Sequence, residues 1–418
     1  MEKSGKFRLT SLERNWILYD VGNSAFVLMV ATLIPIFFNA LAAAGGLSSV
    51  EYLAYWGYAS SAVTIITAVL SPILGTVADT KDFKKPIFIL CVFVGIVGCC
   101  AMGVASAWLP FLVIFVIAKV GFSGSLVFYD SMLSDVTTPE RMDEVSSRGY
   151  AWGYIGSCVP FVVCLGLVLG AGSIGISQMT ALNLALLLTA AWWLLTTLPL
   201  LKSYKQLHYV KVEKHAVRQS FARIGHTLRH LPEDKQVFWF LLAFFCYIDG
   251  VYTIIDMATA YGTALGLDTT GLLLALLVTQ IVAFPSALIF GRLSNKYPSA
   301  KLIPVCIAAY AGIAVFAFFL TQQWQFWVLA VIVGMFQGGV QALSRSHFAK
   351  ITPPEKSGEY FGLFDICGKG ASFLGTMIVS VGSQLTGSAN VGVGSLIVLF
   401  IVGFVLFRVS CKKEVVPE

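Results

Sequence analysis

Long apolar runs, separated by short polar segments that carry most of the charges, recur along the whole chain. Each run reaches about 20 residues, the length that a helix needs to cross the hydrocarbon core of a membrane. Counting these runs predicts twelve transmembrane helices, at residues 16–40, 52–77, 86–106, 109–133, 148–170, 178–200, 236–264, 270–293, 300–320, 324–346, 358–385 and 390–408. The pattern therefore indicates an all-α membrane protein.

The longest hydrophilic stretch divides these spans six and six. It predicts an N-terminal six-helix half at residues 1–200, a linker at 201–235 and a C-terminal six-helix half at 236–418. Apolar residues recur at helical spacing within the linker, with arginines off that stripe, which is typical of an amphipathic helix lying on the membrane surface. The stripe consists of Val217, Phe221, Ile224, Leu228 and Leu231.

Composition agrees with the span pattern. Only 12% of residues are charged and 57% are hydrophobic, whereas a soluble domain carries about 25% charged residues. The nine cysteines form no CxxC pair, so we expect free thiols and no disulfide or redox site. His226 and His230 are spaced like metal ligands, but no Glu or Cys accompanies them. We therefore predict neither a metal site nor a cofactor.

The basic residues predict the orientation. Lys119 and Lys369 sit deep within spans, while the other lysines and arginines occupy the tails, the linker, alternate connections and the span ends beside them. The positive-inside rule therefore places both termini in the cytoplasm. We expect a multi-pass protein of the cell (plasma or inner) membrane, surrounded by lipid. The net charge of +6 then reflects this topology, and no nucleic-acid partner is expected.

The two halves resemble each other at an offset of 215 or 216 residues. Two parallel six-helix repeats, related by an axis along the membrane normal, describe the major facilitator arrangement, in which the substrate site lies between the halves. The matching pairs are Gly75 with Gly291, Asp79 with Asn295, Lys85 with Lys301 and Gly124 with Gly339.

Several motifs carry a family resemblance. The stretch from Gly75 to Asp79, followed by Lys84 and Lys85, resembles the major facilitator signature, and Asn295 departs from it in the second copy. Four further stretches resemble the autophagy-related vacuolar effluxer family and its bacterial relatives: Leu18–Ala25, Ser147–Tyr154, Tyr247–Gly250 and Gly338–Ser346. The resemblance covers nearly the whole chain. It implies transport, and its fungal members are associated with the release of amino acids from the vacuole.

Charged residues inside spans are candidates for function, because a charge at the bilayer centre costs about 2.5–3.5 kcal/mol even on mild scales. Lys119 occupies the place where many major facilitator proteins carry an arginine. Asp365 precedes Lys369 by four residues on one helix face, so a structural ion pair is an equally open interpretation of these two. We predict substrate binding by Lys119, Lys369, Asp249, Asn23 and Gln337, and proton coupling by Asp249, Asp256, Asp365 and Asp20.

A second group of charged residues lies nearer the cytoplasmic span ends. Asp130 and Arg345 are 215 residues apart and carry opposite charges, which suits a gate that bridges the halves. Separate, solvated helix-end charges are the alternative. Asp79 is expected near the N-terminus of span 11, where the helix dipole favours a carboxylate. The predicted gating residues are Asp79, Lys84, Lys85, Asp130 and Arg345.

These observations predict a secondary active transporter that works as a monomer by alternating access. We expect proton-coupled efflux of a small polar or zwitterionic solute, such as an amino acid. An exporter or flippase of amphiphilic lipids is the alternative, and a receptor or scaffold is a different class. Enzymatic activity is not expected, because all five histidines lie in the linker or at a span end and no HExxH motif exists.

Overall fold

The computed structural model describes residues 7–211 and 224–411. Side chains at positions 49, 50, 53, 259, 260, 263, 264, 269, 270, 273 and 369–373 fall outside this description. Within the described ranges the regular structure is helical, apart from one isolated bridge between Thr80 and Val210. The all-α prediction is thus confirmed.

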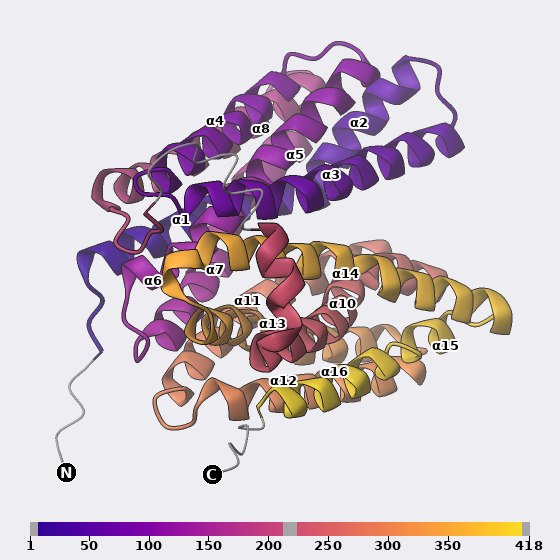
Figure 1. Cartoon of the computed structure of the whole chain (residues 1–418). Helices are drawn as coiled ribbons and strands as arrows, with labels where there is room; N and C mark the ends of the chain where they lie inside the picture. The colour runs from indigo at the N-terminus through magenta and orange to yellow at the C-terminus, as the bar shows by residue number, and fades with distance from the viewer. Residues whose placement is uncertain (1–6, 212–223, 412–418) are drawn as a thin grey trace, which may run out of the picture.

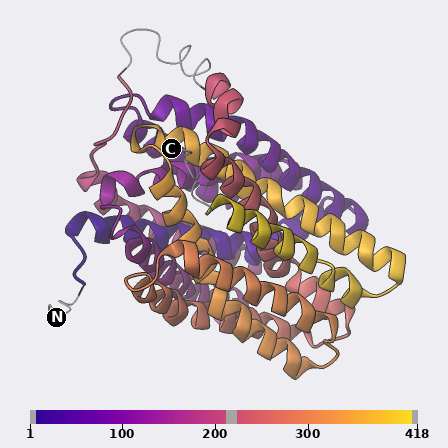
Figure 2. The same ribbon diagram turned by 60° about the horizontal axis from the view of Figure 1, so that its bottom comes forward.

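The helices form two bundles, drawn in indigo to magenta and in red to yellow in Figure 1. The N-terminal bundle contains α1 (Ser11–Ala31), α2 (Leu33–Ala44), α3 (Ser49–Ala78), α4 (Lys84–Met102), α5 (Trp108–Ser131), α6 (Leu133–Val136), α7 (Met142–Leu169) and α8 (Gln178–Ser203). The C-terminal bundle contains η1 (Leu231–Glu233), α10 (Lys235–Ala264), α11 (Thr269–Leu293), α12 (Ser299–Phe318), α13 (Gln323–Ile351), η2 (Pro354–Lys356), α14 (Ser357–Thr386), α15 (Ala389–Gly394) and α16 (Ile397–Ser410). Figure 2 shows the long helices of both bundles running in the same general direction.

In the described part of the chain, eleven helical segments are long and apolar enough to cross a membrane. The remaining predicted span, 358–385, coincides with α14, a helix of 30 residues. At 1.5 Å per residue it is about 45 Å long, more than a bilayer's hydrocarbon core requires. Large apolar side chains such as Leu195, Val69 and Leu90 are exposed, as expected of surfaces that face lipid.

The first predicted span is broken into α1 and α2 at Thr32. Pro35 follows three residues later and has no backbone N–H, so the carbonyl of Ala31 lacks its normal helical partner. The break is local, because α1 and α2 together still form one membrane-length segment, Ser11–Ala44.

The predicted linker helix lies partly outside the described residues, since Val217 and Phe221 fall in the range 212–223. Residues 224–230 are helical. In this part Ile224 is 9% exposed and Leu228 is 52% exposed. The rings of His226 and His230 stack, with their centroids 3.9 Å apart.

The bundles meet mainly where α3 packs against α14 and where α7 packs against α11 and α13. We call the end of the molecule that carries the α8–α10 connection the linker side. Gly75 and Gly358 bring α3 and α14 together there, because a Cβ on either would overlap the carbonyl of the other. From this contact α3 and α14 diverge toward the opposite side (Figure 1).

Candidate transport site and linker-side gate

Asp79 ends α3 at the interface between the bundles and is fully buried. Its Oδ1 accepts the N–H of Gly358 at 2.7 Å, and its Oδ2 accepts the N–H of Glu359 at 2.8 Å. These N–H groups open α14 and have no partner within their own helix, so a carboxylate satisfies them and meets the positive end of the helix dipole. Burial raises the pKa of Asp79 to about 6, although Lys84 and the two N–H groups favour its charged form.

The two predicted gate lysines differ in their surroundings. Lys84 is fully buried, donates to Ser357 Oγ at 2.7 Å and lies 3.6 Å from Asp79 Oδ1. It therefore contacts both bundles. Lys85 instead donates to the Tyr204 carbonyl at 3.3 Å, beyond the end of α8, so this hydrogen bond stays within the N-terminal part of the chain.

Arg345 reaches from α13 into the N-terminal bundle. Its Nη1 lies 2.9 Å from Asp130 Oδ1 and 3.7 Å from Asp20 Oδ2. Its Nε donates to the Ser146 hydroxyl at 2.9 Å. The guanidinium also lies 4.3 Å from the ring centroid of Tyr150. Because Arg345 is only 2% exposed, these contacts replace water around a buried charge.

Asp20, predicted to couple protons, is thus grouped with Arg345. Asn23 lies one turn further along α1, is 3% exposed, and donates to the Tyr19 carbonyl at 3.1 Å and to Asp20 Oδ1 at 3.4 Å. The structure therefore brings Asn23 together with the Asp20–Arg345 group.

The second copy of the signature makes a different contact. Asn295 is exposed, and its Nδ2 donates to Glu144 Oε2 at 2.8 Å. Glu144 lies in the first turn of α7 and also pairs with Arg148. A Cβ on Gly291 would approach the Ser147 Cβ to 2.8 Å, so this crossing is close as well.

Lys119 and Asp256 come from opposite bundles and interact electrostatically. Lys119, on α5, is half-buried, and its Nζ lies 4.7 Å from the ring centroid of Phe122. Asp256, on α10, is exposed to solvent. Lys369 belongs to α14, but its side chain lies outside the described residues.

Asp249 lies in the packed interface between α10 and α14. It is fully buried, and both carboxylate oxygens are 2.9 Å from the Gly375 nitrogen. Thr253 donates to the same carboxylate at 3.3 Å. The carboxyl group is therefore not exposed to solvent in this conformation, unlike Asp256 two turns away.

Two other predicted residues also lie in helix interfaces. Asp365 Oδ2 accepts the Ser71 hydroxyl at 2.7 Å, which joins α14 to α3. Gln337 is 5% exposed on α13, close to Tyr154 of α7. Lys119 and Asp256 are thus two predicted residues of opposite charge, from opposite bundles, whose side chains are not fully buried.

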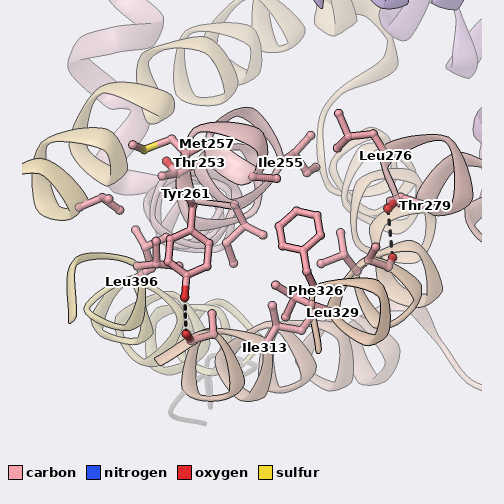
Figure 3. Close-up of a pocket in the computed structure, with 17 residues that line it drawn as sticks. Thr253, Ile255, Met257, Tyr261, Leu276, Thr279, Ile313, Phe326, Leu329 and Leu396 are labelled. Atoms are coloured by element: carbon pink, nitrogen blue, oxygen red, sulfur yellow. Dashed lines mark hydrogen bonds between the residues drawn. The ribbon is translucent and has the colours of Figure 1, made fainter. Parts of the chain in front are cut away.

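A cavity of about 50 Å³ lies inside the C-terminal bundle (Figure 3). Its wall is apolar, formed by residues such as Ile313, Phe326 and Leu329. Two of its polar groups are bonded to nearby backbone: Tyr261 donates to the Ala317 carbonyl at 2.6 Å, and Thr279 donates to the Ala330 carbonyl at 3.1 Å. Such a wall suits an apolar group rather than a charged one.

Sequence reasoning missed several residues at the bundle interface. Glu144 and Glu359 could have been found as acidic residues in first helical turns, where the dipole favours them. Ser146 immediately precedes the Ser147–Tyr154 motif. The contacts of Asp135 could not have been recognised from the sequence, because Tyr204 and His208 lie about 70 residues away in the chain.

Comparisons with known proteins identify the family. Residues 47–414 match the family described as "Vacuole effluxer Atg22 like". The chain belongs to this family. It is 42% identical over 404 residues to the Bacillus subtilis protein described as an uncharacterized MFS-type transporter, YxiO, covering 96% of this chain and 94% of the relative.

More distant relatives extend this picture. Autophagy-related protein 22 of Coccidioides immitis is 25% identical over 314 residues, covering 64% of this chain. The matched region spans about half the length of that fungal protein, at 51%. The human organic anion transporter MFSD10 has the same fold, with a TM-score of 0.72, 14% identity and coverage of 95% and 98% of the two chains. The family match and the relative described as an MFS-type transporter, at 42% identity, show that the chain is a major facilitator transporter and not an enzyme.

Proposed function

We propose that this Atg22-like protein is a proton-coupled secondary transporter of small polar or zwitterionic solutes such as amino acids. Family membership supports transport. The solute class rests on one observation, the opposite charges of Lys119 and Asp256, which come from different bundles and act on each other. A zwitterion placed between them meets a cation and an anion, and each charge-assisted hydrogen bond contributes about 1.5–3 kcal/mol.

We further propose that the linker side is cytoplasmic and that the protein lies in the cell membrane. The distribution of lysine and arginine supports this orientation, and the Bacillus relative supports a bacterial inner membrane. Contacts of Asp79, Lys84 and Arg345 then close the cytoplasmic side. In alternating access this corresponds to the outward-facing state, and opening requires these contacts to break.

The solute class is tested by thermal unfolding of the purified, full-length protein. Amino acids, dipeptides, nucleosides and lysolipids are added in turn, because a ligand at 100 times its dissociation constant stabilises the folded state by about 2.7 kcal/mol. We expect a zwitterion to raise the midpoint temperature of unfolding. Lys119→Met and Asp256→Asn should each lower the affinity for that zwitterion at least tenfold. Glu140→Gln, in an exposed loop, is the matched control. Stabilisation that is unchanged in both variants contradicts the proposal.

Proton coupling is tested separately in liposomes. Asp249 is the first candidate, because protonation would remove the charge that holds the Gly375 N–H and so change the packing of α10 on α14. We expect Asp249→Asn to abolish uphill transport driven by a pH gradient while substrate binding persists. If that variant still moves substrate uphill, Asp256, Asp365 and Asp20 become the remaining candidates.

The apolar cavity favours a second candidate function, export of amphiphiles. Its test is the same unfolding screen. Stabilisation by lysolipids alone, which disappears when Ala330→Trp fills the cavity, supports this alternative and contradicts the zwitterion proposal.

A further inference from the structure

We call the contacts of Asp79, Lys84 and Arg345 that join the two bundles the linker-side gate. The chain returns to this gate after α8. Residues 204–211, which we call the strap, run beside the end of α3. Gln206 Nε2 donates to the Ala78 carbonyl at 3.1 Å, and the Val210 N–H donates to the Asp79 carbonyl at 2.8 Å. The strap is therefore bonded to the backbone of the residue that holds the N-terminus of α14.

Asp135 fixes the strap from the other side. This α6 residue is 4% exposed. Its Oδ2 accepts the Tyr204 hydroxyl at 2.6 Å, and its Oδ1 accepts the His208 N–H at 2.9 Å. The imidazole Nδ1 of His208 lies 2.9 Å from the same Oδ1. Asp135 Oδ2 is also 3.9 Å from Lys84 Nζ, so one carboxylate contacts both the strap and the gate.

The closed gate buries more acidic groups than basic ones. Asp79, Asp135 and Glu359 are each at most 4% exposed, and Lys84 is the buried cation among them. Glu359 acts electrostatically on Asp79, and its Oε1 has no hydrogen-bond partner within the described residues. Because removing like charges from water is costly, such a cluster is stabilised by an added proton.

We propose that the His208–Asp135 pair is a proton-binding site that stabilises the closed linker-side gate. The His208 side chain is 37% exposed, so it can exchange a proton with the linker-side solution. A protonated imidazole gives Asp135 a second cation, which leaves Lys84 for Asp79 and Ser357. Opening separates Glu359 from Asp79 and admits water, so proton binding stabilises the open state less than the closed state.

The direction of the pH effect follows from the difference in proton affinity between the closed and open states. The charged and titratable groups around His208 and its cluster include the acids Asp135 on α6, Asp79 at the end of α3 and Glu359 on α14. They also include Lys84 and Lys85 on α4, Tyr204, Lys205, Tyr209 and Lys211 in the strap, and Lys81, whose Nζ lies 5.6 Å from the Tyr209 ring centroid. Because the closed state binds the proton more tightly, closure is favoured at low pH. Closure is therefore weakened as pH rises. One linked proton changes the closed-to-open ratio by at most about tenfold per pH unit.

The inference rests on the alternating access of the proposed function, and its test needs no substrate. Phe83 and Glu355 are exposed on either side of the gate. Both are changed to cysteine in a Cys411→Ser background, because Cys411 is exposed, and spin labels report their distance in the full-length protein in lipid discs. As pH rises from about 5.5 to 8.5, we expect a decline in the population with a short distance between the two spin labels.

His208→Gln should reduce this pH dependence at least by half. His230→Gln is the matched control and should leave it unchanged, because the His230 ring stacks on His226. Glu359→Gln should keep the gate closed at higher pH, which provides a second test if His208→Gln folds poorly. A profile of His208→Gln equal to the parent overturns the inference. A distance that responds to a transported solute but not to pH also overturns it, and leaves the proposed function standing.

Discussion

The two copies of the signature at the linker side differ in which partner supplies the negative charge. Asp79 is fully buried and accepts two N–H groups from the N-terminus of α14. Asn295, its counterpart, is exposed and donates to Glu144, an acid that already lies in the first turn of α7. In one copy the connecting loop supplies the anion, and in the other the helix supplies it.

This difference makes the gate electrostatically asymmetric. A hydrogen bond to a charged, buried group contributes about 1.5–3 kcal/mol, whereas contacts of exposed groups contribute less because water competes for them. The α3–α14 crossing should therefore control closure, while the α7–α11 crossing mainly guides packing. Matched substitutions in the two copies can test this ranking.

The largest effect is expected from Gly75→Ala. Its added methyl group would overlap the Gly358 carbonyl, and a backbone atom cannot rotate away, so we expect the closed state to lose about 3 kcal/mol. That is a shift of roughly 100-fold toward the open state. The Phe83–Glu355 label pair measures it. Gly291→Ala is the matched variant, because its methyl group would approach the Ser147 Cβ to 2.8 Å, a less severe overlap. An equal shift in both variants would refute the asymmetry.

An intermediate effect is expected from Asp79→Asn. The variant loses the charge of two buried hydrogen bonds and places amide hydrogens near two N–H donors, which costs the closed state about 2 kcal/mol. In the Cys411→Ser background, the cysteine of Ser357→Cys, buried in the closed state, should then react about 30-fold faster with a water-soluble maleimide. Asn295→Ala should change this rate only slightly. Reaction at the parent rate in Asp79→Asn would show that this contact does not hold the gate.

The smallest effect is expected from Asn295→Asp. The new carboxylate faces Glu144, and because position 295 is exposed the repulsion should cost less than about 1 kcal/mol. We expect a few-fold increase in the open population at low salt. Raising the ionic strength to about 1 M, where the Debye length is about 3 Å, should remove this increase. An effect that persists at high salt would point to lost packing instead of charge.

For some of the predicted charged residues the sequence indicated the contacts that the structure shows, and for others it did not. Asp79 was expected at the N-terminus of span 11, and its carboxylate accepts the first N–H groups of α14. That expectation rested on the helix dipole, which favours a carboxylate at a helix N-terminus. Asp249 was expected to meet substrate, but its carboxylate is buried against Gly375. Its role remains a proposal.

The sequence alone predicted the all-α membrane fold and the family. Burial in lipid requires long apolar runs, which can be recognised without knowing any partner. Tertiary structure decided which polar groups meet. The crossing of α3 on α14 selects Gly358 and Glu359 as partners of Asp79, and the return of the strap brings His208 to Asp135. Such pairings depend on helix rotation and crossing position, and these are set by packing between segments that lie far apart in the chain.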